Sequence, residues 1–142
     1  MNLLELARKA RKVIAGGQAT PADIWRLAKA FMRGTFYALW YRLIRRDVVI
    51  RLPFMAYAPV RILGKGSVFI DEGCSVFASV FRGLTIMTMS RDSKVRIGKG
   101  CDLGGLTIRC RNSVTLGDKV MTAVSLVQDT MVVHGRDIGM QN

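Results

Sequence analysis

Residues Val95–Val120 read VRIGKGCDLGGLTIRCRNSVTLGDKV, and a shorter stretch at Val68–Val76 reads VFIDEGCSV. In both stretches an aliphatic residue is followed at once by Gly or Asp, and a small residue stands four places after the aliphatic one. The three sets are Ile70 with Asp71 and Cys74, Ile97 with Gly98 and Cys101, and Leu116 with Gly117 and Val120. Six-residue units of this kind are typical of a parallel β-helix, where self-similarity reveals what a single window does not. The sequence therefore predicts a mainly β fold built from stacked coils.

Short β-branched runs broken by glycine also occur in the chain before and between these stretches. They are Val48–Leu52, Val60–Ile62, Val68–Ile70, Val80–Met87, Val95–Ile97, Leu106–Ile108 and Val114–Leu116. A hairpin meander would need a primed turn pair such as Asn-Gly at each corner, and neither Asn-Gly nor Asp-Gly occurs in the chain. The spacing from Val95 to Val114 corresponds to one coil. The longer spacing from Val68 to Val95 is interpreted as a coil and a half, with a bulge or external loop within Phe81–Ser93.

The chain divides by composition into a basic helical segment, residues 1–46, and a β-helix, residues 47–142. The formal net charge is +12, and residues 1–51 hold 11 Lys and Arg against Glu5, Asp23 and Asp47. Most of the excess positive charge therefore belongs to the N-terminal segment. Such an asymmetry favours an anionic partner there: a membrane surface, a polyanionic substrate or nucleic acid.

Two helices are predicted in the basic segment. Apolar residues of Leu3–Ile14 recur on one helical face, and a second helix is expected from Ala22 to about Arg46, because Thr20 can cap it and Pro21 suits its first turn. The second helix mixes aromatic and basic residues. It either packs on the β-helix with its arginines in solvent, or lies at a membrane interface through Trp25, Phe36, Trp40 and the flanking arginines. Nucleic acid is not expected to be the partner, because no nucleic-acid module is recognisable.

Three cysteines do not make a disulfide framework, and no signal peptide or bilayer-spanning run is apparent. These features favour a cytoplasmic location for the protein, including peripheral association with the inner face of the membrane. Cys74 and Cys101 are expected to fill small inward positions of the coils. Cys110, between Arg109 and Arg111, could have a lowered pKa. One histidine in the whole chain argues against the zinc site of a β-helical carbonic anhydrase, so no metal is expected.

At Leu106–His134, LTIRCRNSVTLGDKVMTAVSLVQDTMVVH, the chain resembles the hexapeptide-repeat acyltransferases, and among them the sugar O-acetyltransferases. The likeness extends over Asp47–Gly135, and a basic helix before the β-helix is also familiar in these transferases. The resemblance implies a left-handed parallel β-helix assembled as a homotrimer, with acetyl-CoA bound in the groove between subunits. It also implies a saccharide acceptor from cell-envelope polysaccharide biosynthesis.

The resemblance also implies the roles of particular residues. His134 follows Leu116 by one full coil and matches the histidine that acts as the general base on the acceptor hydroxyl. Asp129, five positions earlier, is the nearest acid before His134 and could orient its imidazole. Arg109, Arg111 and Lys119 could meet the CoA phosphates across a trimer interface, or form a solvated face.

The chain departs from the family pattern in its last part. The asparagine that binds the acceptor in the family is replaced by Gly104-Gly105, and Thr122 and Gln128 are polar at positions expected to face inward. Family members continue for two or more coils beyond the histidine, whereas this sequence ends less than half a coil after it. The alternative hypothesis is therefore a truncated, catalytically inactive β-helix that serves as an oligomerising or membrane-apposed module.

Overall fold

A computed structural model of the protein describes residues 4–5, 8, 11, 15–16, 20–77 and 83–129. The helix predicted over Leu3–Ile14 falls largely outside these residues. Within them, a helix α2 (Pro21–Ile44) is followed by ten short strands. The strands are β1 (Val48–Ile50), β2 (Met55–Ala56), β3 (Val60–Leu63), β4 (Ser67–Ile70), β5 (Ser75–Val76), β6 (Leu84–Thr88), β7 (Lys94–Ile97), β8 (Leu106–Cys110), β9 (Ser113–Leu116) and β10 (Ser125–Gln128).

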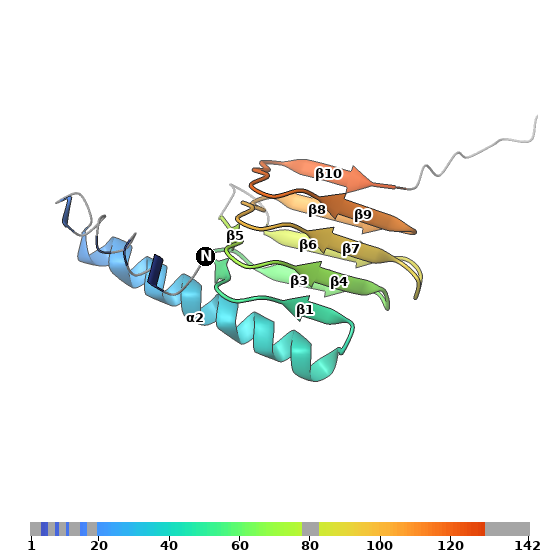
Figure 1. Ribbon diagram of the computed structural model, residues 1–142, viewed down its shortest axis with the longest axis horizontal. Coiled ribbons are helices and arrows are strands. Elements are labelled where there is room, and N and C mark those ends of the chain that lie inside the picture. Colours follow the sequence, from blue (N-terminus) through green and yellow to red (C-terminus); the bar gives the residue numbers. More distant parts are fainter. Residues whose placement is uncertain are drawn as a thin grey trace, which may run out of the picture.

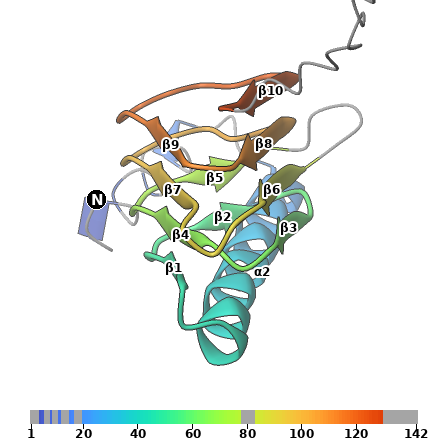
Figure 2. The ribbon, with the colours of Figure 1, turned by 90° about the vertical axis from the view of Figure 1, so that its right-hand side faces the viewer.

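The strands form three parallel sheets that wrap around one core. One sheet has the order β1-β4-β7-β9, a second has the order β10-β8-β6-β3, and a third contains β2 and β5. The chain visits the three sheets in turn and rises by one strand at each pass, which makes a parallel β-solenoid (Figures 1 and 2). The predicted mainly β fold with stacked parallel coils is confirmed.

The strand register shows where each coil begins and ends. Val95 pairs with Val114, so the prediction that one coil separates them is confirmed. Val68 pairs directly with Val95, so the interpretation of this longer spacing as a coil and a half is wrong. The segment forms a single coil that is lengthened in two places, between β5 and β6 and at Met89–Ser93 between β6 and β7. The predicted loop region Phe81–Ser93 includes the lengthening at Met89–Ser93, but it also contains the strand β6, and the other lengthening begins before it. The extra residues leave the stacking of the strands unchanged.

Alternate residues of each strand fill the interior. Ile62, Ile86 and Ile108 stand above one another on neighbouring strands and are buried. Val68, Val95 and Val114 form a similar column on the sheet that contains β4. A period of two sends one set of side chains inward and the other to solvent, which is why short aliphatic runs are sufficient to specify the coils.

The corners after β4 and β7 explain the repeated small residue. The buried thiols of Cys74 and Cys101 donate to the carbonyls of Gly98 and Gly117, each at 3.1 Å. Burial raises the pKa of the Cys74 thiol to about 12. The prediction that Cys74 and Cys101 fill inward positions is confirmed.

Helix α2 lies across the open end of the first coil (Figures 1 and 2). Thr20 is the N-cap as predicted, and its N–H donates to the Asp23 carboxylate at 3.1 Å, but the helix begins at Pro21, one residue before the predicted Ala22. The face toward the coil carries a seam of small buried residues, Ala30, Gly34 and Ala38. The Tyr41 hydroxyl donates to the Val60 carbonyl at 3.4 Å and accepts the Ile62 N–H at 3.1 Å. A solenoid needs such a cap because its end coil would otherwise expose core and strand edges.

Candidate functional site

Three cationic turns stack at the corner where the sheet containing β3 passes to the sheet containing β4. Lys65 lies in the β3–β4 turn, Arg91 in the β6–β7 turn, and Arg111 in the β8–β9 turn directly above. Arg45, just after α2, reaches this corner and donates from Nη2 to the Gly66 carbonyl at 3.0 Å. We call these four residues, Arg45, Lys65, Arg91 and Arg111, the basic corner.

Buried hydroxyls join the successive turns of the basic corner. Thr88 Oγ1 accepts the Gly66 N–H at 2.9 Å and donates to the Leu63 carbonyl at 3.1 Å. In the next coil, Ser93 Oγ donates to the Arg111 carbonyl at 2.6 Å. The β3–β4 turn is closed by Gly64 at a φ of 94°, where a Cβ would lie 1.9 Å from the Thr88 carbonyl oxygen. The cations therefore project from turns whose backbones are fixed to one another.

An open pocket of about 390 Å³ lies at the basic corner, lined by Arg45, Asp47, Lys65 and Arg91. Its volume falls in the range of small-molecule sites. Three cations against one carboxylate make it suited to an anion, and arginine in particular can bind phosphate oxygens in a bidentate manner. The arrangement can therefore hold a phosphate-bearing ligand.

Asp129 lies at the same corner, one coil above Cys110. Its Oδ1 accepts the Arg111 N–H at 2.7 Å, and its Oδ2 accepts the Asn112 N–H at 2.6 Å. The turn thus fixes the orientation of the carboxylate. Whether Asp129 orients His134 stays a prediction, because His134 lies outside the described residues.

The pKa of the Cys110 thiol differs from the prediction. Burial raises the pKa of this thiol, and the neighbouring Asp129 raises it further. Arg109 and Arg111 are exposed on the outside of the coil, whereas the thiol is buried inside. The expectation of a lowered pKa is wrong because sequence neighbours in a strand point to opposite faces.

The strand register also shows whether Thr122 and Gln128, the two polar residues predicted to face inward in the last described coil, do so. Thr122 does face the interior, where its Oγ1 donates to the Asp102 carbonyl at 3.1 Å. Gln128 does not, because it pairs with the exposed Arg109 and is itself exposed. The polar residues above the core are instead Ser125, which pairs with buried Leu106, and Asp129.

The residues predicted to contact CoA are not all in one place. Arg111 belongs to the basic corner and Arg109 lies two residues before it on the outer face of β8, but Lys119 lies in the turn that follows β9. The strand β9 separates the two corners by roughly 13 Å at about 3.3 Å per residue. Lys119 has a φ of 57° at the position where the two coils below have Gly73 and Gly100, so it also closes a turn. Sequence reasoning missed Arg45, Lys65 and Arg91, whose common feature is a position just outside a helix or strand.

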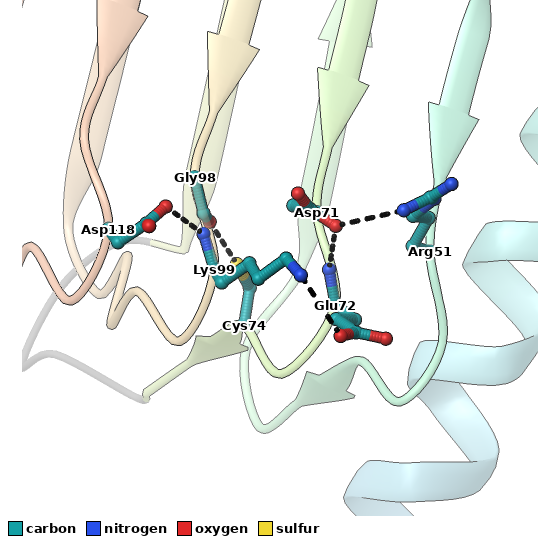
Figure 3. A network of polar contacts seen from close by, with 7 residues as sticks. All are labelled: Arg51, Asp71, Glu72, Cys74, Gly98, Lys99 and Asp118. Carbon is teal, nitrogen blue, oxygen red and sulfur yellow. Dashed lines mark hydrogen bonds and ion pairs between the residues drawn. The ribbon is translucent and has the colours of Figure 1, made fainter. Parts of the chain in front are cut away.

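A second polar cluster lies at the other end of the strands and joins the coils (Figure 3). Arg51 pairs with Asp71, and Lys99 pairs with Glu72, each at 3.5 Å. The Lys99 N–H also donates to the Asp118 carboxylate of the next coil at 2.8 Å. Since these contacts run along the stack from coil to coil, we assign the cluster to the stability of the solenoid.

The Glu72 N–H donates to Asp71 Oδ1 and lowers the pKa of this carboxyl below its ordinary value of 3.8, and Lys99 and Arg51 lower it further. The ionised form therefore stabilises the fold above about pH 4 and loses this effect as the pH falls through the lowered pKa. Asp71→Asn should destabilise the protein by about 0.5–1 kcal/mol at pH 7. Urea unfolding should show this difference shrinking toward pH 3. Asp92→Asn, in the β6–β7 turn, is the matched control; an equal loss there would contradict the assignment.

In the part of the chain that the structure describes, no group of three His, Cys, Asp or Glu residues could hold a metal ion. Among the same residues, no helix is long and apolar enough to cross a membrane. Comparison with the known protein families, with curated proteins and with solved structures finds no match to this chain. The solenoid and the chemistry of its basic corner are therefore the features that bear on function.

Proposed function

We propose that the protein transfers an acetyl group from acetyl-CoA to a hydroxyl of a saccharide, as the resemblance of Leu106–His134 to the sugar O-acetyltransferases implies. The observation that supports this function best is the open pocket at the basic corner. CoA is a strongly anionic donor, and Arg45, Lys65 and Arg91 offer three cations around an open pocket of about 390 Å³. Asp129, which precedes His134 by five positions, lies at the same corner.

The chemistry requires a base and a site for the developing negative charge. The His134 imidazole takes the proton of the acceptor hydroxyl while that oxygen attacks the thioester carbonyl. A tetrahedral oxyanion forms, and backbone N–H groups at a coil corner are the donors available to stabilise it. The intermediate then expels the CoA thiolate, which takes up the proton from the imidazolium. The products are an O-acetyl saccharide and free CoA, and no covalent enzyme intermediate is needed.

The same proposal includes the features that the resemblance brings. The solenoid would be left-handed and assembled as a homotrimer, and the acceptor would belong to cell-envelope polysaccharide biosynthesis. In such an assembly the basic corner of one subunit can face a neighbouring subunit. The resemblance alone would instead let Arg109, Arg111 and Lys119 meet the CoA phosphates across the interface, and the test below distinguishes the two sites. The inactive oligomerising module stays the competing hypothesis, and it predicts no transfer to any saccharide.

The donor site is tested by removing two charges at a time. Lys65→Ala combined with Arg91→Ala should raise the KM for acetyl-CoA by about tenfold or more, with a smaller change in kcat, because phosphate contacts contribute to binding before and during the reaction. The measurement is transfer of labelled acetyl to a panel of saccharides.

The matched control removes the same charge elsewhere, by Arg109→Ala combined with Lys119→Ala. Its KM should change less than that of the first double variant. Equal KM values in the wild type and the first variant would contradict a donor site at the basic corner. A selective rise of KM in the control variant would instead place the CoA phosphates at Arg109 and Lys119.

A further inference from the structure

Helix α2 has a second apolar face that the solenoid does not cover. Its members are all at least half exposed, from 50% for Trp40 to 84% for Leu43. Trp25 and Leu43 are each nine positions from Gly34, about two and a half turns, so they lie on the side opposite the seam. We call this face the outer stripe, and it consists of Trp25, Met32, Phe36, Leu39, Trp40 and Leu43.

The close packing of the seam on the first coil fixes the orientation of α2, so the helix cannot rotate to bury the outer stripe. A Cβ at Gly34 would lie 1.7 Å from the Phe54 carbonyl oxygen, which shows how closely the backbones approach. Tyr41 further anchors the inner face through its two hydrogen bonds to β3. On the outer face, the rings of Phe36 and Trp40 stack at 5.8 Å between centroids. The outer stripe is thus a fixed apolar surface that faces away from the core.

Cations flank the outer stripe on both sides. Residues 21–46 contain Arg26, Lys29, Arg33, Arg42, Arg45 and Arg46, against Asp23 as their one acid. With about 3.6 residues per helical turn, Arg26 and Arg33 fall on one side of the stripe and Arg42 on the other. Tryptophan rings bordered by cations are typical of helices that lie in the plane of an anionic membrane surface.

We infer that the protein docks on an anionic phospholipid bilayer through the outer stripe of α2. The apolar side chains enter the boundary between headgroups and acyl chains, and the flanking arginines pair with lipid phosphates. A second copy of this chain fits the stripe less well, because two such helices face to face would bring their cations together. The solenoid, attached to the inner face, then projects away from the bilayer with its basic corner accessible from the aqueous side.

Binding of the full chain to lipid vesicles tests this inference without acetyl-CoA. Trp25 and Trp40 are the two tryptophans of the chain and both lie in the outer stripe. Vesicles of phosphatidylcholine with phosphatidylglycerol should therefore shift their emission to the blue and sediment the protein. Vesicles of phosphatidylcholine alone should do so much less, and added salt should weaken the binding.

Two variants separate the apolar and the charged contributions. Trp25→Ser, Trp40→Ser and Leu43→Ser together should lower the partition coefficient on anionic vesicles by about tenfold or more. Arg26→Gln, Arg33→Gln and Arg42→Gln together should give a similar loss while the apolar face stays intact. The matched control carries Met121→Ser, Val124→Ser and Leu126→Ser, three exposed apolar residues on the last described coil, and should bind like the wild type.

The inference is overturned if the wild type does not bind anionic vesicles at low salt, or if the control loses binding as much as the stripe variant. It is also overturned if the stripe variant changes the oligomeric state in solution while vesicle binding is absent, because a second copy then covers the stripe. Transfer of acetyl to soluble saccharides should be unchanged in the stripe variant. Failure of docking and failure of the proposed function are therefore distinguishable.

Discussion

Gly34→Leu should detach α2 from the first coil and lower the free energy of unfolding by about 3 kcal/mol or more. The reason is steric: a Cβ at this position would lie 1.7 Å from the Phe54 carbonyl oxygen and 2.6 Å from the carbonyl carbon. Both obstacles are backbone atoms, which cannot turn aside as a flexible side chain can. Loss of the cap would also expose the buried core residues of the first coil. Guanidinium unfolding followed by circular dichroism measures the change.

The control adds the same side chain to the same helix at an exposed position. Ala28 is exposed, so the free energy of unfolding of Ala28→Leu should stay within about 0.5 kcal/mol of the wild type. If Gly34→Leu were as stable as Ala28→Leu, the seam of Ala30, Gly34 and Ala38 would not be the contact that holds the helix. Because the outer stripe is defined by its position opposite this seam, that result would remove the structural basis for membrane docking as well.

The sequence indicates the solenoid because its signals are local. Ile97, Gly98 and Cys101 identify a corner within a few positions, and the inward and outward alternation of the strands is visible in runs such as Val95–Ile97. The start of α2 is equally local, since Thr20, Pro21 and Asp23 are consecutive or nearly so. Features of this kind can be recognised in the sequence without knowing which coil lies above or below them in the stack.

Other parts of the fold could not be predicted because they depend on contacts between coils. The strands β2 and β5 have two residues each, too few for an alternation to be seen. Counting along the sequence assigns Gln128 inward, whereas the pairing of β10 with β8 sets it beside exposed Arg109. Counting fails wherever a turn gains residues, since the extra residues change the spacing without changing the pairing.

The basic corner is invisible in the sequence for the same reason. Lys65 and Arg91 are far apart along the chain, and they become neighbours only because Val68 pairs with Val95 across the lengthened coil. The outer stripe is visible in composition, through Trp25, Phe36 and Trp40, but the sequence leaves open whether that face packs on the solenoid. The structure resolves this by giving α2 two apolar faces, with the small residues inward and the large ones outward.

His134→Ala should have the largest effect on activity. Acetyl transfer to a saccharide needs a group that takes the proton of the attacking hydroxyl, and general base catalysis contributes about 10²–10⁴-fold in rate. His134 is the single histidine of the chain, and its assignment comes from the resemblance of Leu106–His134 to the acetyltransferases. An imidazole base is active only when neutral, so kcat/KM of the wild type should fall as the pH is lowered and the imidazole becomes protonated.

The most direct test of acetyl transfer as the function is the rate at which labelled acetyl passes from acetyl-CoA to saccharide hydroxyls, measured for the wild type beside His134→Ala. CoA binding by both proteins shows that the substitution leaves the donor site intact. The proposed mechanism predicts turnover by the wild type and a loss of about 10²–10⁴-fold in the variant with CoA binding retained. Equal rates in the two proteins, or no transfer by the wild type to any saccharide of the panel, would contradict it.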